Sequence, residues 1–152
     1  PDAFDAELAD ETSCQWAASA YFNIFSSPAA PALLLASDAA QLRGIWEGVE
    51  EDAVAEYLSV LGTEEALGAA LNWYRANTAN RRFTSDPIGA VTVPTLFIWS
   101  DADDAVCRET AERSADFVTG PYRFEIIEGV NHWVPEQASE AVTTLLLEQL
   151  AL

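Results

Sequence analysis

The stretch Val93-Pro-Thr-Leu-Phe-Ile-Trp99, with Ser100-Asp-Ala-Asp-Asp104 directly behind it, decides the fold of this chain. A short apolar run behind a proline is typical of a strand that is covered on both faces, as in a parallel sheet. Residues 122–127 form a second run of this kind, and helical periodicity is found over residues 107–118 and 135–150. The second half of the chain is therefore predicted to be β, α, β, α.

The first half of the chain reads as successive helices, predicted over residues 6–25, 30–36, 38–47, 50–61 and 63–77. The last of these begins with Thr63, an N-cap residue, and the glutamates Glu64 and Glu65 suit the positive end of the helix dipole. We therefore expect residues 1–80 to form an all-helical domain that precedes an α/β part over residues 81–152.

Two strands that are covered on both faces do not make a stable parallel sheet by themselves, because their long apolar edges would be left unpaired. We therefore expect a companion polypeptide to supply the remaining strands, so that the working protein is a heterodimer. Proteolytic processing, two separate genes and a cut during preparation all remain open as the origin of the separation.

The composition narrows the class of partner. The chain has 152 residues, of which 50% are hydrophobic and 11% aromatic, so it folds as one globular domain or as part of a larger one. With 25 acidic and 7 basic residues its formal charge is −18, which repels nucleic acid and anionic membrane surfaces. The expected partner is a small-molecule substrate. The cytoplasm is favoured as the compartment, with secretion open if the companion portion carries a signal peptide.

The two cysteines give no sign of a metal site. Cys14 and Cys107 lie far apart in the chain, and neither has a histidine at ligand spacing, so no zinc motif exists. Two free thiols are favoured over a disulfide. The absence of lysine excludes mechanisms that need one, and with them the aspartate-based phosphotransfer that Asp101-Ala-Asp103 superficially suggests.

A single histidine, His132, follows the second predicted strand in Glu128-Gly-Val-Asn-His-Trp133, just as the acidic run 101–104 follows the first. Reacting groups collect at the carboxyl ends of the strands in open parallel sheets, so we expect an acid and His132 to face each other. Such a pair is the base half of nucleophilic hydrolysis, because the carboxylate fixes one ring nitrogen as a donor and leaves the other to accept a proton. The plainer readings are a packing histidine and a solvated acidic loop.

The chain order of acid and then histidine, with a nucleophile still earlier, is that of the α/β-hydrolase fold. The segment from Val93 to Asp103 resembles the strand and turn before the acid in that superfamily, and Gly129-Val-Asn-His-Trp133 resembles its histidine loop. The resemblance places Asp103 in the acid position. Ser100 stands where a turn glycine is usual and Asp104 where a proline is often found, so Asp101 and Asp104 remain rivals.

Two further segments resemble the helical cap of soluble epoxide hydrolases. They are Leu71-Asn-Trp-Tyr-Arg75 and Tyr21-Phe-Asn-Ile-Phe-Ser-Ser-Pro28. The resemblance implies that the phenols of Tyr21 and Tyr74 grip an epoxide oxygen and stabilise the alkoxide that forms on ring opening. Substrate-binding side chains are then expected at Phe25, Trp73 and Trp133. No cofactor and no metal is implied.

The resemblance spans the chain as a helical cap followed by the C-terminal part of the hydrolase core, but it leaves the nucleophile out. No Gly-x-Ser-x-Gly occurs in the sequence. The expected activity is epoxide opening to a vicinal diol through a covalent ester, with the nucleophile on the companion chain. Two alternatives remain: an esterase, lactonase or dehalogenase in which Tyr21 and Tyr74 only shape the pocket, and a non-catalytic, hydrolase-like ligand-binding protein.

Overall fold

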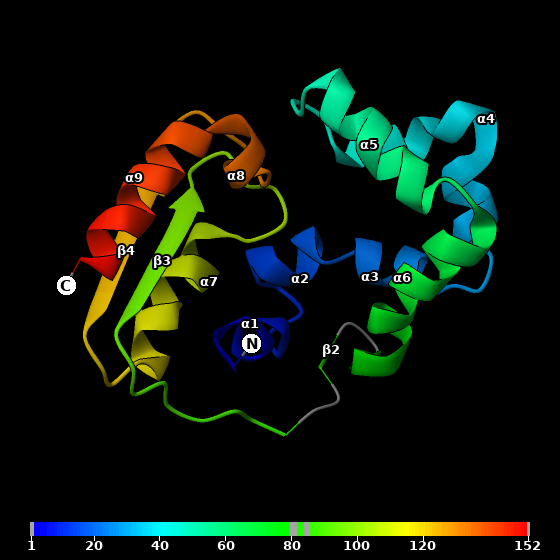
Figure 1. The fold of residues 1–152 in the computed structure, drawn as a ribbon. Helices are drawn as coiled ribbons and strands as arrows, with labels where there is room; N and C mark the ends of the chain where they lie inside the picture. Colours follow the sequence, from blue (N-terminus) through cyan, green and yellow to red (C-terminus); the bar gives the residue numbers. More distant parts are fainter. Residues whose placement is uncertain (1, 80–81, 84–85, 152) are drawn as a thin grey trace. The chain divides into compact units, whose positions relative to one another are not determined.

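The computed structural model describes residues 2–79, 82–83 and 86–151, and these form two compact units (Figure 1). One unit lies within Pro1–Ser19 and Asp86–Leu152, and the other within Ala20–Ser85. The division near residue 85 lies close to the predicted boundary at residue 80. The first 19 residues differ from the prediction, because they group with the strands of the second half and not with the remaining helices.

The unit within Ala20–Ser85 is helical and ends in a small antiparallel strand pair. Its elements are α3 (Tyr21–Phe25), α4 (Ala30–Ile45), α5 (Glu51–Leu61), α6 (Glu64–Asn77), β1 (Thr78–Ala79) and β2 (Arg82–Phe83). The N-cap predicted for α6 is confirmed, since the Thr63 hydroxyl accepts a hydrogen bond from the amide of Ala66 at 3.2 Å. Helix α6 packs against α4. Leu67 and Leu71 of α6 are buried, and so is Leu34 of α4.

Helix α4 contains a sharp kink that the sequence analysis expected as a break between two helices. Ser37, Asp38 and Ala39 have φ values of 54°, 59° and 57°, which lie in the left-handed region. None of the three is glycine, so the kink carries backbone strain. The two predicted helices, over residues 30–36 and 38–47, correspond to the two arms of α4.

The other unit contains the parallel strands β3 and β4. Its elements are α1 (Asp2–Leu8), α2 (Cys14–Ala18), β3 (Thr95–Ser100), α7 (Arg108–Arg113), the 3₁₀ turn η1 (Ser114–Phe117), β4 (Tyr122–Ile127), α8 (Val134–Gln137) and α9 (Ser139–Leu150). The strands run in register from Thr95 opposite Tyr122 to Ser100 opposite Ile127. Both strands therefore end at the same edge of the sheet, as predicted.

The single helix predicted over residues 6–25 is wrong, because this stretch forms the three short helices α1, α2 and α3. Short polar side chains take the backbone amides that a continuous helix would use. The carboxylate of Asp10 accepts from the amide of Thr12 at 2.8 Å, and the hydroxyl of Ser13 caps α2 by accepting from the amide of Trp16 at 3.0 Å. The alanines of this stretch are not enough to carry a helix past such residues.

The strands are only partly covered by the residues that the structure describes. Trp99 and Ser100 are buried, but the preceding residues of β3 are half-buried and Ile126 of β4 is 39% exposed. Within the described ranges β3 pairs with β4 alone. No helix in these ranges is long and apolar enough to cross a membrane.

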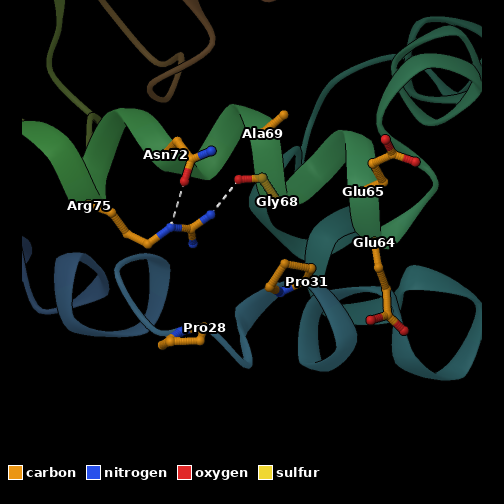
Figure 2. Close-up of a pocket in the computed structure, with 8 residues that line it drawn as sticks. All are labelled: Pro28, Pro31, Glu64, Glu65, Gly68, Ala69, Asn72 and Arg75. Carbon is orange, nitrogen blue, oxygen red and sulfur yellow. Dashed lines mark hydrogen bonds between the residues drawn. The ribbon is translucent and has the colours of Figure 1, made fainter.

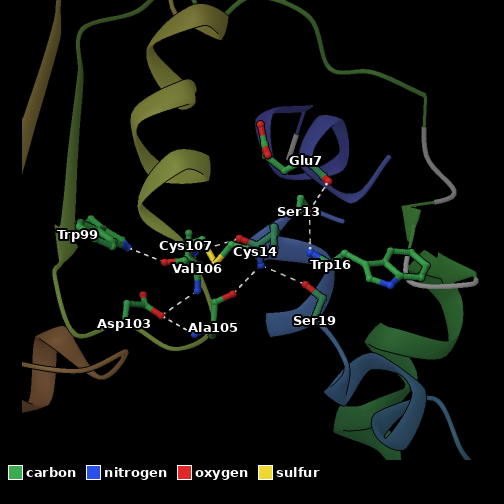
Figure 3. Close-up of a disulfide and its surroundings, with 11 residues drawn as sticks. Glu7, Ser13, Cys14, Trp16, Ser19, Trp99, Asp103, Ala105, Val106 and Cys107 are labelled. Atoms are coloured by element: carbon green, nitrogen blue, oxygen red, sulfur yellow. Dashed lines mark hydrogen bonds between the residues drawn. A yellow bond between two sulfur atoms is a disulfide. The ribbon is translucent and has the colours of Figure 1, made fainter. Parts of the chain in front are cut away.

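The expectation of two free thiols is wrong, because Cys14 and Cys107 form a disulfide (Figure 3). Their Cα atoms lie 6.2 Å apart although the residues are 93 positions apart in the sequence. The bond joins α2 to the residue that precedes α7. The grouping of the first 19 residues with the strands follows in part from this link.

Candidate active site

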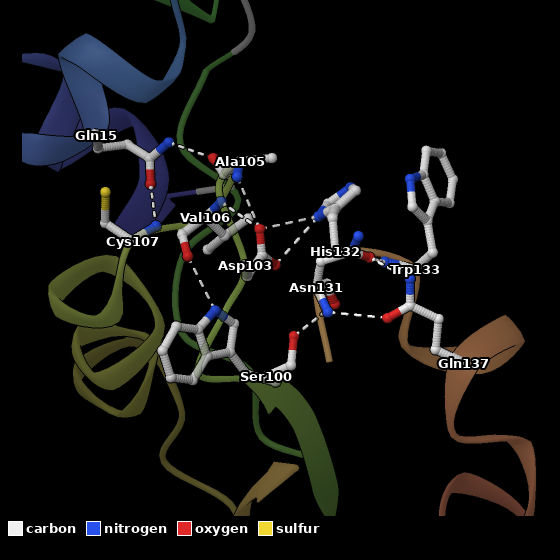
Figure 4. Close-up of polar contacts among 11 residues, drawn as sticks. Gln15, Ser100, Asp103, Ala105, Val106, Cys107, Asn131, His132, Trp133 and Gln137 are labelled. Carbon is white, nitrogen blue, oxygen red and sulfur yellow. Dashed lines mark hydrogen bonds and ion pairs between the residues drawn. The ribbon is translucent and has the colours of Figure 1, made fainter. Parts of the chain in front are cut away.

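The candidate site is formed by the two loops that leave the carboxyl ends of β3 and β4 (Figure 4). The first loop carries Asp103, three residues beyond the end of β3, and the second carries His132, five residues beyond the end of β4. Because the strands are parallel and in register, the loops leave the same edge of the sheet and bring the two side chains together.

His132 and Asp103 make direct contact. The Nδ1 atom of His132 lies 3.1 Å from each carboxylate oxygen of Asp103. An ionised carboxylate only accepts hydrogen bonds, so Nδ1 carries the proton and the opposite nitrogen, Nε2, has its lone pair available. The Asp103 side chain is 6% exposed and that of His132 is 41% exposed, so the pair has a buried acid and an accessible base.

The protonation states follow from these contacts. The hydrogen bond to Asp103 raises the pKa of His132 above its ordinary value of 6.5, burial lowers this pKa, and nearby negative charges raise it further, for a net increase. Burial alone would raise the pKa of Asp103, but the hydrogen bonds from His132 and two backbone amides outweigh it, and the net pKa lies below 3.8. Asp103 is therefore ionised at neutral pH.

The two other carboxylates that follow β3 have different surroundings. One oxygen of Asp101 accepts a hydrogen bond from the amide of Gly129 at 2.7 Å, which ties the two loops together. Gly129 has a φ of 76°, a conformation that glycine adopts without strain. Asp104 is exposed and acts on His132 through its charge, which raises the pKa of the histidine. Of the three rivals, Asp103 is the one that lies against the His132 ring.

The histidine loop is held in place by residues that were not predicted from the sequence as part of the site. The buried hydroxyl of Ser100 donates to the backbone carbonyl of Asn131 at 2.7 Å. The amide group of Gln137 makes two bonds with Asn131, accepting from its backbone amide at 3.0 Å and donating to its side-chain oxygen at 2.7 Å. Ser100 at the usual glycine position was the one available signal of this network. The same side-chain oxygen accepts from the amide of Trp133 at 3.1 Å, and the Trp133 ring lies edge-on to His132 at 5.3 Å.

Four of the predicted site residues form an aromatic cluster in the helical unit. The rings of Tyr21 and Tyr74 are 6.0 Å apart between centroids, at an angle of 81°. Phe25 packs edge-on against both, at 5.2 Å and 5.0 Å. Trp73 is 52% exposed, and its ring centroid lies 4.9 Å from that of Tyr74. Burial raises the pKa of Tyr74 above 10.0, so its phenol keeps its proton at neutral pH and remains able to donate.

A separate open pocket lies in the helical unit between α6 and the start of α4 (Figure 2). Arg75 turns back along its own helix, where it donates to the side-chain oxygen of Asn72 at 2.9 Å and to the backbone carbonyl of Gly68. Neither Tyr21 nor Tyr74 lines this pocket, whose walls are Pro28, Pro31, Glu64, Glu65, Gly68, Ala69, Asn72 and Arg75.

Among the described residues one group has the side-chain types of a metal site, namely Cys14, Cys107 and Glu109. Both sulfur atoms are taken up in the disulfide, so they have no thiolate to offer a metal ion. This group does not fit a metal.

Comparison with known proteins gives relatives of one kind. No family model matches. The chain is 32% identical over 108 residues to "Epoxide hydrolase A" of Mycobacterium tuberculosis, a match that covers 70% of this chain and 33% of that protein. It is 30% identical over 103 residues to "Epoxide hydrolase 3" of Xenopus tropicalis, covering 66% of this chain and 26% of that protein. The matches thus span about a third or less of these curated relatives.

Solved structures with a similar fold cover nearly the whole chain. An epoxide hydrolase from Bacillus megaterium matches with a TM-score of 0.75 and 18% identity, over 99% of this chain and 57% of that one. A structure described as one of the novel epoxide hydrolases of the α/β-hydrolase superfamily from metagenomes of hot environments matches with a TM-score of 0.75 and 24% identity. That match covers 97% of this chain and 54% of the other. At these identities the likeness concerns the fold.

Proposed function

Because this chain is a homologue of epoxide hydrolases and has part of the α/β-hydrolase fold with a helical cap, we propose that it supplies the cap and the proton-handling residues of an epoxide hydrolase. The contact between His132 Nδ1 and the Asp103 carboxylate carries the proposal. It leaves Nε2 of an accessible imidazole ready to take a proton from water. A base that lies within reach of water and has a pKa near the operating pH is what ester hydrolysis requires.

The reaction runs in two steps. A carboxylate oxygen of an aspartate on other polypeptide attacks an epoxide carbon, the carbon–oxygen bond of the ring breaks, and an ester forms. The leaving oxygen takes a proton from the phenol of Tyr21 or Tyr74. Water then attacks the ester carbonyl while His132 accepts its proton. The tetrahedral intermediate collapses, its acid proton passes to the leaving alkoxide oxygen, and the diol and the free carboxylate are released. The proton on His132 returns to the tyrosine phenolate, which restores both groups. Asp103 stabilises the imidazolium that forms in this second step.

We place the nucleophile outside these 152 residues, on a companion portion that also carries the missing strands. Two observations support this. The relatives are about two to four times as long as the part that this chain matches. Apolar side chains are exposed before β3 and along α9, including Ile88 at 68%, Val93 at 61% and Leu147 at 63%. Further strands would cover such side chains and pair with β3.

Trapping the ester tests the proposal. The first step does not use His132, so His132→Ala in the assembled protein should accumulate the ester, whereas the wild type should hydrolyse it. After incubation with styrene oxide, intact-mass measurement should find a species heavier by the mass of the epoxide in His132→Ala, and peptide mapping should place it on an aspartate of the companion portion.

Two other results of this experiment each have a defined meaning. Absence of an adduct with styrene oxide, together with cleavage of an aryl ester by the wild type and none by His132→Ala, would contradict epoxide chemistry and favour an esterase. An adduct located on this chain would contradict the companion nucleophile while leaving the epoxide chemistry in place.

A further inference from the structure

Gln15 is a buried polar residue that the proposed mechanism does not use. It lies in α2 and is 1% exposed. Its amide nitrogen donates to the backbone carbonyl of Ala105 at 2.7 Å and to the hydroxyl of Ser19 at 3.1 Å, and its oxygen accepts from the backbone amide of Cys107 at 3.0 Å. The Gln15 side chain is thus hydrogen-bonded to the backbone of the residues on both sides of Val106 (Figure 4).

The same backbone segment holds the carboxylate of Asp103. The amides of Ala105 and Val106 donate to its Oδ1 atom at 2.8 Å and 2.9 Å. On the strand side, the indole nitrogen of Trp99 donates to the carbonyl of Val106 at 2.9 Å. The position of Asp103 therefore depends on a loop that is bound from β3 on one side and from α2 on the other.

A covalent bond reinforces the contact from α2. Cys14, the neighbour of Gln15, forms the disulfide with Cys107 (Figure 3). Cys107 is also the residue whose backbone amide donates to Gln15 (Figure 4). Helix α2 has only five residues, too few to be stable as an isolated helix. The disulfide holds this short helix against the loop that carries Asp103, so that the side-chain amide of Gln15 reaches the backbone groups of Ala105 and Cys107.

We propose that Gln15 is a positioning residue for Asp103, and that the Cys14–Cys107 bond holds α2 where Gln15 can act. This role rests on the proposed function, since a carboxylate held in one place matters for the step in which His132 activates water. Gln15 suits this role because a neutral amide supplies a donor and an acceptor at once without adding a charge beside the buried carboxylate.

Replacing Gln15 in the assembled protein tests the role. Gln15→Met keeps the length of the side chain and removes all three hydrogen bonds. A less firmly held Asp103 pairs less well with His132, so we expect the pKa of His132, followed by NMR, to move down towards 6.5. Hydrolysis of the ester should slow by about 10-fold or more, with ester formation unchanged. Gln41→Met, at an exposed position of α4, should change neither quantity and serves as the control.

A second variant keeps the test decisive if Gln15→Met does not fold. Cys14→Ser combined with Cys107→Ser removes the cross-link and should shift the pKa of His132 and the rate of ester hydrolysis in the same direction. Unchanged values for either folded variant, even with a lower midpoint of thermal unfolding, would reduce Gln15 and the disulfide to structural roles and overturn the proposal. The titration needs no substrate, so a shifted pKa without any epoxide reaction would contradict the proposed function alone.

Discussion

Asp103 is held more firmly than the other carboxylates that follow β3. It receives two backbone hydrogen bonds and the contact with His132, while its side chain is almost fully buried. Asp101, two residues earlier, uses its carboxylate to tie the loops together. Asp101, Asp103 and Asp104 have the same side-chain chemistry. At the scale of single residues, the partners of each carboxylate therefore make the difference between a structural acid and a candidate catalytic acid.

The pKa values predict how activity depends on pH. His132 accepts a proton only when it is neutral, so ester hydrolysis should fall as the pH drops through its pKa, which lies above 6.5. Asp103→Asn removes the negative charge that raises this pKa, so the acid limb of the pH–rate profile should move to lower pH. The maximal rate should fall by roughly 100-fold or more.

The matched control for that profile is Asp104→Asn. Asp104 raises the pKa of His132 by its charge alone, so this variant should move the acid limb by a smaller amount in the same direction and leave the maximal rate nearly unchanged. An acid limb that stays in place in Asp103→Asn would contradict the assignment of this limb to His132.

At the scale of elements, short polar residues decide where the helices begin and end. Ser13 starts α2 and Thr63 starts α6, each by accepting a hydrogen bond from an amide in the first turn. The cap of α6 was predictable because glutamates and an apolar stripe follow it. The cap of α2 was missed because the alanines and aromatic residues around it favour a continuous helix. Local signals therefore locate a helix more easily than they locate its breaks.

The cap of α6 gives a prediction at this scale. Thr63→Ala leaves the amide of Ala66 without its side-chain partner and should lower the free energy of unfolding by about 1 kcal/mol. Ser59→Ala removes a hydroxyl on the exposed face of α5 that donates to the backbone carbonyl of Glu56. It should change the free energy of unfolding by less than about 0.5 kcal/mol. Denaturant unfolding of the assembled protein compares the two, and equal midpoints would contradict the capping role.

At the scale of the whole molecule, the described residues leave apolar surface uncovered. Leu146, Leu147 and Leu150 of α9 are 47%, 63% and 82% exposed, and β3 has β4 as its single partner within the described ranges. Monomeric proteins rarely expose apolar side chains in such groups. The disulfide adds a second point, because such bonds persist in oxidising compartments and are rare in the cytosol. This bears on the compartment, which stays a prediction.

The uncovered surface predicts how the isolated chain behaves. The 152 residues without a companion should self-associate, because β3 offers unpaired backbone groups and α9 offers apolar side chains. Light scattering coupled to size-exclusion chromatography should find oligomers or aggregates, and addition of the companion portion should convert them into a defined complex. A monodisperse monomer that unfolds cooperatively would contradict the companion proposal.

The sequence alone was sufficient for the parallel strands β3 and β4, the helix α6, and the placing of an acid and His132 at strand ends. These features are encoded within about ten neighbouring residues, as apolar runs, helical periods and turn residues. It did not reveal the disulfide, the hydrogen bonds of Gln15 to the loop that carries Asp103, or the hydrogen bonds of Ser100 and Gln137 to Asn131. Those contacts join a side chain to a side-chain or backbone group of another segment at distances of about 3 Å or less, and only packing in three dimensions selects which groups meet.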